Sequence, residues 1–449
     1  MDNRPLVPPE AGQGDAPSSV WYAATVFFPA FCMFTAFGAS LLTMPLTVQG
    51  WGLDVGNVAY LTTVKEVSEL VANFPASTIL VHVGARGSML LGSALYATIG
   101  VPLALAPDYA SFALFFLFQG VVVKVYNRGQ GAILKDAGGK RGRVSGTLVT
   151  CKYVAMAAAP HLTARMAEPL GGAQHMYFVQ VGLGILMVGS LLATPRPPAQ
   201  IAAAAAPPLA QVGGAKGSEA AAAVGYGAVL RDPDSRRDLA AAASMCSLVS
   251  MLRGAYNVLL PVSLLALGLP PSAASLSMSM TYGVAAVFPL LVGRWLDAAG
   301  RRPCAVASMV CFAVGHGGLG LASLLGPSDA RLAAVVAASA VALGLADSLS
   351  SPLGYTLKGD AAASEERRCL DQGWAAGDVK ARVARFMATL DVALDFVGIF
   401  YPIALGLVAT KVSVAAASFL FAGVACAGRG IAALCGYESG SASDCSARR

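Results

Sequence analysis

The sequence has few charged residues. Lys, Arg, Asp and Glu make up 12% of its 449 residues, whereas an ordinary soluble domain carries about 25%. Hydrophobic residues reach 56%, which excludes a soluble globular enzyme, a disordered chain and a fibrous protein. The segments 90–107, 177–194 and 332–346 hold no charge at all, and a bilayer crossing takes about 20 apolar residues. The composition therefore predicts a polytopic membrane protein.

Motifs for metal, nucleotide or catalytic chemistry are missing. The nine cysteines form no CxxC pair, and the four histidines show no metal-ligand spacing, so we expect free thiols, no metal and no other cofactor. No Walker element and no paired nucleophile and base occur. ATP-driven transport and enzymatic activity are therefore not expected. The net charge of +6 is attributed to cytoplasmic loops, and no nucleic-acid partner is expected.

Twelve apolar segments bounded by Gly, Pro or charge are expected to form helices. They are 20–45, 57–81, 88–106, 110–132, 144–164 and 176–194, followed by 239–264, 272–292, 303–325, 332–353, 384–408 and 412–428. The predicted fold is an all-α polytopic membrane protein with two six-helix bundles. Its parts are a tail 1–18, a bundle 19–194, a linker 195–238, a bundle 239–428 and a tail 429–449. The most charged stretch, 354–383, is expected to be a long loop on the linker's side.

The distribution of basic residues predicts the orientation in the membrane. Outside the helices, only Arg165, Arg331 and Lys411 of the 31 basic residues fall on the side opposite the linker. Cytoplasmic loops carry the excess of Lys and Arg, so both termini and the linker are expected in the cytoplasm. Residues 1–18 hold one base against three acids, which does not fit a signal peptide. We expect a multi-pass, monomeric protein in a lipid bilayer.

The two halves of the chain repeat each other. A shift of 216 residues aligns special backbone positions without a gap. The aligned pairs are Pro45 with Pro261, Gly52 with Gly268, Gly84 with Gly300 and Arg86 with Arg302. The repeat predicts two six-helix halves related by duplication.

One copy of the repeat carries a recognisable loop motif. The segment 293–302 reads GRWLDAAGRR, which is similar to the sequence G-x-L-A-D-R-x-G-R-R of the major facilitator superfamily of secondary transporters. The matching residues are Gly293, Asp297, Gly300, Arg301 and Arg302, and the first-half copy keeps Gly84 and Arg86. The resemblance implies twelve helices, a solute site near the midplane and a conformational gate at these residues.

Ten charged residues lie within the predicted spans, where each costs several kcal/mol if it faces lipid. We expect nine of them to line a substrate and coupling cavity: Lys65, Glu69, Lys124, Arg128, Lys152, Arg253, Asp347, Asp391 and Asp395. The tenth, Glu66, has no clear role. In the superfamily, the helices at these positions line the central cavity. The resemblance implies that the charged residues face such a cavity in this protein.

The sign of these charges differs between the halves. The first half is basic overall and the second acidic, so we expect an anionic solute group in the first and a proton carrier in the second. Asp391 and Asp395 share a helix face and repel each other, which favours protonation of one of them. Structural alternatives remain: Lys65 could pair with Glu69, and Arg253 could be the counter-ion of Asp391 or Asp395. Arg128 could reach the inner interface.

These patterns predict a transporter that moves a small charged or zwitterionic organic solute by alternating access, coupled to protons. An uncoupled facilitator of the same fold is the alternative within transport. A protein of this fold that senses a ligand or anchors partners, without moving solute, is the alternative outside it.

Overall fold

The computed structural model describes residues 19–135, 141–195, 226–289, 291–292, 295–296, 300–374 and 376–434. Every element in these ranges is a helix. The first half contains α1 (Ser19–Tyr22), η1 (Ala23–Phe27), α2 (Phe28–Gly50), α3 (Val55–Leu105), α4 (Tyr109–Lys135), α5 (Arg141–Met166), η3 (Ala173–Met176) and α6 (Tyr177–Ala193). The second half contains α9 (Tyr226–Arg231), α10 (Pro233–Ala266), α11 (Pro271–Val287), α13 (Arg301–Ala322), α14 (Leu332–Asp371), α15 (Ala376–Lys411) and α16 (Val414–Leu434).

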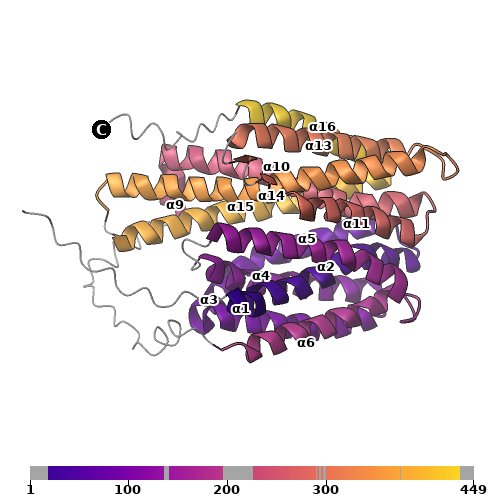
Figure 1. The fold of residues 1–449 in the computed structure, drawn as a ribbon, viewed down its shortest axis with the longest axis horizontal. Coiled ribbons are helices and arrows are strands. Elements are labelled where there is room, and N and C mark those ends of the chain that lie inside the picture. The colour runs from indigo at the N-terminus through magenta and orange to yellow at the C-terminus, as the bar shows by residue number, and fades with distance from the viewer. Residues whose placement is uncertain are drawn as a thin grey trace, which may run out of the picture.

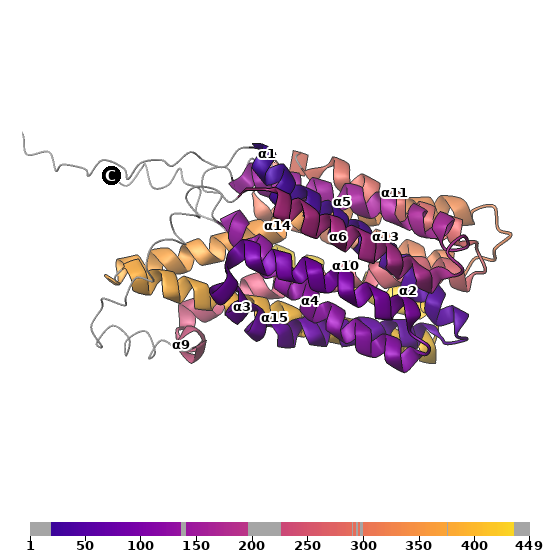
Figure 2. The same cartoon turned by 90° about the horizontal axis from the view of Figure 1, so that it is seen from below.

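The long helices run side by side and form two layers. In Figure 1 helices α2 to α6 occupy the lower part of the molecule and α10 to α16 the upper part. Figure 2 shows the same helices from a perpendicular direction, again with their axes nearly parallel. The halves meet mainly where α3 packs against α15 and α5 against α11. A single cluster of buried apolar side chains, including Tyr153 and Leu252, extends across both halves.

Each predicted span overlaps a helix of the structure, although some predicted ends differ: α11 ends at Val287 and α13 at Ala322, and α16 begins at Val414. Nine helices in the described ranges are long and apolar enough to cross a membrane. The predicted spans 57–81 and 144–164 lie in α3 and α5, and 272–292 overlaps α11 as far as Val287, but these three are not among the nine. The all-α membrane fold is thus confirmed, and the crossing by these three segments stays a prediction.

The internal repeat is visible in the backbone. Gly52 and Gly268 have φ of 72° and 73°, and Gly84 and Gly300 have φ of 74° and 83°. Each pair is separated by the shift of 216 residues found in the sequence. These left-handed conformations favour glycine, because a Cβ atom would crowd the following carbonyl. Gly84 divides α3 into two helical parts at a kink, so the prediction of separate helices in this region is confirmed.

The prediction of a loop at 354–383 is wrong. Helix α14 continues through Pro352 to Asp371, and α15 begins at Ala376. Both helices extend beyond their neighbours at one end of the bundle (Figure 1). The charges of this stretch pair along and between helices: Arg368 Nη1 lies 2.8 Å from Glu365, three residues earlier, and Arg382 Nε lies 2.6 Å from the same carboxylate. Helical ion pairs, and not loop solvation, thus account for its high charge.

The same network holds the start of α10. That helix begins at Pro233, before the predicted position 239, and Asp232 is its N-cap. Burial alone would raise the pKa of Asp232, but hydrogen bonds from the Ser235 hydroxyl (2.6 Å) and the backbone N–H of Asp234 (3.1 Å) lower it. Arg368 also forms an ion pair with Asp238. The extended ends of α10, α14 and α15 are therefore joined by charge.

Candidate functional site

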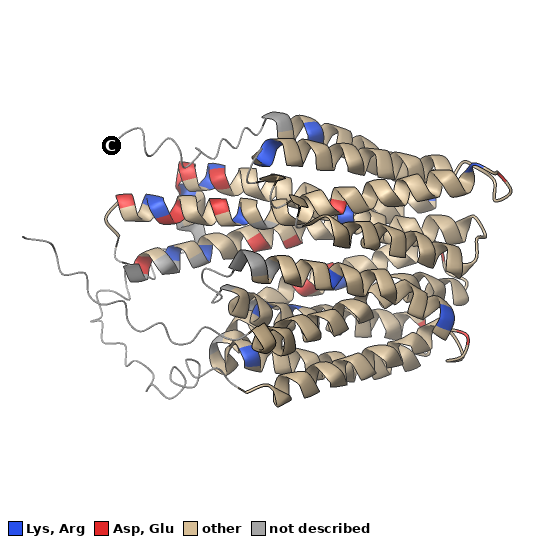
Figure 3. Cartoon of the chain, in the orientation of Figure 1, with Lys and Arg blue, Asp and Glu red and all other residues tan. Residues whose placement is uncertain are grey.

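Several of the predicted site residues lie at a similar depth in the bundle. Figure 3 shows charged residues concentrated at one end, hereafter the charged end, where α14 ends and α15 begins, with isolated charges further along the helices. Lys124 follows the start of α4 at Tyr109 by about 22 Å, since each residue rises 1.5 Å. The same measure places Asp395 about 24 Å from Lys411, and Lys152 about 21 Å from Met166. These distances all start from the opposite end.

Asp395 of α15 joins the two halves. Its Oδ2 accepts hydrogen bonds from Lys124 Nζ of α4 and from Asn73 Nδ2 of α3, each at 2.6 Å. The side chains of Lys124 and Asp395 are 13% and 19% exposed. At this burial a charge-assisted hydrogen bond is strong, and an unpaired charge would be costly. The contact therefore holds α3, α4 and α15 together.

Asp391, one turn nearer the charged end, is shared by two cations. Arg128 Nη1 of α4 lies 3.3 Å from Oδ2, and Lys358 Nζ of α14 lies 3.0 Å from Oδ1. Arg128 also donates through Nη2 to Asn73 Oδ1 at 2.6 Å. Arg128 is thus engaged between the halves. The repulsion expected between Asp391 and Asp395 is offset, because Asp391 has two cations and Asp395 has Lys124.

Lys65 and Glu69 of α3 pair with each other, as the structural alternative predicted. Lys65 Nζ lies 2.5 Å from Glu69 Oε1 and 3.9 Å from Glu66 Oε1, and 5.6 Å from the centre of the Phe37 ring. Glu66 Oε2 faces Gly398 of α15, where a Cβ atom would lie only 2.8 Å from it. Glu66 therefore also belongs to the surface between the halves.

Arg253 pairs with Asp347 and not with Asp391 or Asp395, so the predicted counter-ion was wrong. Arg253 Nε of α10 donates to Asp347 Oδ1, and Tyr256 donates to Oδ2 of the same carboxylate at 2.7 Å. Asp347 is buried, with 1% of its side chain exposed against 27% for Arg253. The carboxylate of Asp347 is thus buried, whereas the guanidinium of Arg253 remains partly exposed. Helix α10 packs against both α14 and α15, so the direction of the Arg253 side chain, which reaches Asp347 of α14, decides the pairing.

A second contact between the halves adjoins Arg253. The hydroxyl of Tyr153 on α5 hydrogen-bonds to that of Ser351 on α14. Ser351 also accepts a hydrogen bond of 2.7 Å from Arg253 Nη2. The neighbouring residue on α5, Lys152, has its Nζ 4.5 Å from the centre of the Phe34 ring. The structure thus brings Lys152 and Arg253 to one region, while the Asp391 and Asp395 contacts form another.

The predicted gating residues lie in different settings. Arg86 donates to the carbonyls of Leu191 and Thr194 at the end of α6, where a cation complements the helix dipole. Arg301 Nε lies 3.0 Å from Asp360 Oδ2 of α14, and Arg302 is exposed. Gly84 and Gly300 form the turns described above. Gly293 and Asp297 lie outside the described residues.

The sequence did not point to every residue of these clusters. Asn73, which bridges Arg128 and Asp395, is uncharged, so it carried no signal. Lys358 was assigned to a loop, although it lies on α14. Tyr153 was not distinguished from other aromatic residues. Lys358 could have been placed among the site residues only if the predicted helix 332–353 had been extended into the charged segment that follows it.

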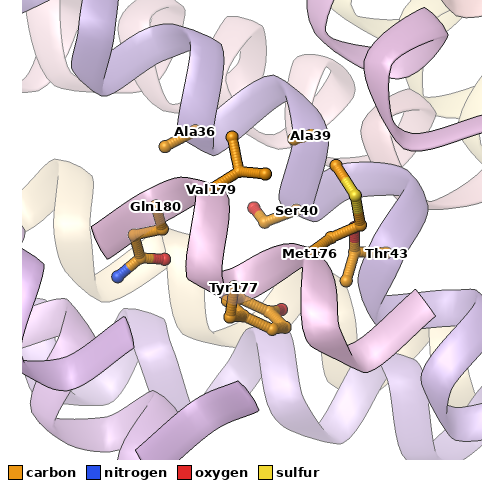
Figure 4. Close-up of a pocket in the computed structure, with 8 residues that line it drawn as sticks. All are labelled: Ala36, Ala39, Ser40, Thr43, Met176, Tyr177, Val179 and Gln180. Atoms are coloured by element: carbon orange, nitrogen blue, oxygen red, sulfur yellow. The ribbon is translucent and has the colours of Figure 1, made fainter. Parts of the chain in front are cut away.

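A small pocket lies away from these clusters, between α2 and the segment formed by η3 and α6 (Figure 4). Its lining residues are Ala36, Ala39, Ser40, Thr43, Met176, Tyr177, Val179 and Gln180. The lining holds no charged group, so this pocket has little in common with the charged clusters. In the part of the chain that the structure describes, no group of three or more His, Cys, Asp or Glu residues could hold a metal ion.

Comparisons with known proteins agree with the fold. A family model described as Major Facilitator Superfamily matches residues 242–438. The structure of a variant of the nucleoside transporter NupG is similar with a TM-score of 0.68 and 12% identity, covering 93% of this chain and 100% of that one. A POT family transporter in complex with a thioalcohol-conjugated peptide has a TM-score of 0.64 and 13% identity, covering 92% and 94%. No curated protein matches the sequence.

Proposed function

We propose that this chain, whose residues 242–438 match the Major Facilitator Superfamily model and whose fold resembles transporters of known structure, is a member of that superfamily. It moves a small charged or zwitterionic organic solute across a membrane by alternating access, coupled to protons. The charged end faces the cytoplasm, since loops rich in Lys and Arg stay on that side. Both termini lie there as well, and the protein works as a monomer with twelve spans. The turns at Gly84 and Gly300, with Arg86 and Arg301, belong to the gate.

The observation that carries this proposal is the ion pair between Lys124 and Asp395. It joins α4 of the first half to α15 of the second across 2.6 Å, within the hydrophobic part of the bundle. Halves that rock apart at this level must break it, and a bare charge in the membrane costs several kcal/mol. A proton on Asp395 removes the carboxylate charge and so weakens the pair. Protonation and opening are thereby linked.

Contacts on both sides of this level fit the same mechanism. Toward the opposite end, Ser275 of α11 and His161 of α5 hydrogen-bond at 2.9 Å, and α15 approaches α3 closely at Gly406 and Ala59. Toward the charged end, Arg128 reaches Asp391. Alternating access requires two such sets of contacts, of which one opens while the other stays closed.

Uncoupled facilitation is the second candidate. The observation that favours it is that the carboxylates of Glu66, Glu69, Asp347, Asp391 and Asp395 each have a cation within 4 Å. Such pairs can be purely structural, and they would then hold the helices together without exchanging protons.

The deciding experiment measures proton and solute flux in proteoliposomes. The purified chain is reconstituted under an imposed pH gradient and given a panel of small organic anions, zwitterions and cations. We expect a solute-triggered proton flux that Asp395→Asn reduces at least tenfold. Glu69→Gln tests whether a second carboxylate takes part. Asp371→Asn, an exposed carboxylate at the end of α14, is the matched control and should transport as the parent does.

The outcomes separate the candidates. Solute uptake without proton movement, equal in all variants, would leave an uncoupled facilitator with structural ion pairs. Binding of a solute without any uptake would identify a sensor of this fold.

A further inference from the structure

Lys152 is a half-buried cation with no carboxylate within 4 Å among the residues that the structure describes. Among the described residues, every other charged side chain predicted within the spans forms an ion pair within 4 Å, and Lys152 forms none. Its Nζ lies over the Phe34 ring, 4.5 Å from the centre, and 5.9 Å from the centre of the Tyr153 ring. A cation–π contact supplies only part of what hydration or an anion would supply. An anion next to the ammonium group of Lys152 would therefore stabilise it.

Arg253 faces the same region from the other half. Its Nε and Nη2 are occupied by Asp347, Ser350 and Ser351, while Nη1 has no acceptor among the described residues. Its side chain is 27% exposed although it lies deep in the bundle. Arg253 and Asp347 are the charged groups that act on Lys152. Tyr153, which follows Lys152 in α5, hydrogen-bonds to Ser351, and Arg253 donates to the same hydroxyl, so this contact lies next to both cations.

The charges of this region do not balance. Lys152 and Arg253 contribute two positive charges, and Asp347 one negative charge. A ligand with a single negative charge would complete the balance, whereas a dianion would exceed it. The two oxygens of a carboxylate match two donors that come from opposite halves.

The wall beside Lys152 is aromatic. Phe34 and Phe37 of α2 pack edge to face with their ring centres 6.4 Å apart, and Lys65 lies 5.6 Å from the Phe37 ring. When the ammonium group of Lys152 turns from the ring to a carboxylate, the face of Phe34 becomes free for an apolar group. A flat or aromatic body would pack there.

We propose that Lys152 and Arg253 form the subsite for the carboxylate of a singly charged organic anion, whose apolar body packs against Phe34. This proposal rests on the proposed transport function and specifies its solute class. It separates the solute subsite, between α5 and α10, from the ion pairs at Asp391 and Asp395. Binding there would tie α5 of the first half to α10 of the second.

The test is ligand binding by the full-length protein in detergent, followed by thermal unfolding and titration. The probes are benzoate and nicotinate, their neutral amides benzamide and nicotinamide, the cation benzylamine, and phenyl phosphate as the dianion. We expect the two carboxylates to raise the unfolding midpoint and to bind at least tenfold more tightly than the amides, the amine or the phosphate.

Variants assign the effect to the subsite. Lys152→Met should weaken benzoate binding at least tenfold, and Lys152→Arg should restore most of it. Lys411→Met removes an equal charge from an exposed position at the end of α15 and should bind as the parent does. Phe34→Leu should weaken benzoate binding more than acetate binding. The unfolding midpoint without ligand shows whether each variant is folded.

Either of two results overturns the proposal: no binding by any carboxylate probe, or benzoate affinity unchanged in folded Lys152→Met. Its failure is distinct from failure of the transport function. If solute flux in proteoliposomes is unchanged by Lys152→Met, the transport function is supported and the proposed subsite is rejected. If carboxylate binding depends on Lys152 but no solute flux is found, the subsite is supported and the transport function is rejected.

Discussion

Asp395 concentrates the contacts between the halves in one carboxylate. It accepts from Lys124 and from Asn73 at 2.6 Å each, so one oxygen serves two helices of the other half. Removal of one partner from a buried pair leaves an uncompensated charge, which is more harmful than removal of both.

This asymmetry predicts the outcome of a double-mutant cycle. Asp395→Asn and Lys124→Met should each lower the free energy of unfolding by about 3 kcal/mol, and the double variant should lose less than the sum. Denaturant unfolding in detergent measures all four proteins. The matched cycle uses Lys411→Met and Asp371→Asn, whose exposed side chains share no contact, and should be additive within about 0.5 kcal/mol. Additive losses at Lys124 and Asp395 would contradict a direct pair.

At the residue scale the sequence identified the charged groups better than their partners. A charge in an apolar run is visible without a structure, which is why Lys124, Asp391 and Asp395 could be named. The partner of Arg253 could not be named, because α10 packs against both α14 and α15 and only the structure shows that the side chain reaches α14. Asn73 gave no signal, since a single amide in a helix is compatible with many roles.

At the scale of elements, α14 and α15 exceed what a membrane requires. They contain 40 and 36 residues, about 60 and 54 Å at 1.5 Å per residue, against a hydrocarbon core of about 30 Å. Their ends must therefore lie in water, where the ion pairs of Glu365 and Arg368 are located. Hydropathy limits a predicted span to its apolar part, so the sequence predicted 332–353 and 384–408 correctly as helical but missed their extensions.

The glycine turns make a prediction at the same scale. Gly300→Ala and Gly84→Ala place a Cβ atom on a backbone with φ near 80°, and each should lower the free energy of unfolding by about 1–2 kcal/mol. Gly283→Ala is the control, because that glycine is helical and a Cβ atom there meets nothing within 4 Å. It should leave stability unchanged or raise it by about 0.5–1 kcal/mol.

Thermal and denaturant unfolding of the three variants check this. Equal effects at Gly283 and Gly300 would show that backbone conformation is not the reason for glycine at the turns.

For the whole molecule, the repeat made the two-half architecture predictable. The spacing of 216 residues between special glycines survives in the structure as equal backbone angles at Gly52 and Gly268. The contacts by which the halves meet were not predictable, because they depend on rigid-body placement of one bundle against the other. That α3 lies along α15, and α5 along α11, follows only from the coordinates.

A cross-link between the halves tests their relative movement. A Cβ atom on Gly406 would lie 2.9 Å from that of Ala59, while a disulfide needs about 3.5–4.5 Å, so a slight separation of the helices suffices. Oxidation of the variant with Ala59→Cys and Gly406→Cys should abolish solute flux, and reduction should restore it. A protease site inserted between residues 205 and 206 lets gel electrophoresis report the bond.

The single variants Ala59→Cys and Gly406→Cys, treated with the same oxidant, are the controls and should retain flux. Full activity of the cross-linked protein would show that transport does not require separation of α3 and α15 at this end.

Asp391 sets an order for the separation of the halves at the charged end. One of its cations, Lys358, belongs to its own half, and the other, Arg128, keeps Asn73 in the opposite half. When the bundles part, each of these charges retains a polar partner, so this contact can come apart without any exchange of protons. Asp395 has no cation of its own half within 4 Å among the described residues. The two carboxylates, one helical turn apart, therefore differ. The contact at Asp391 can break while all its groups stay charged, whereas the contact at Asp395 breaks only after the carboxylate is neutralised.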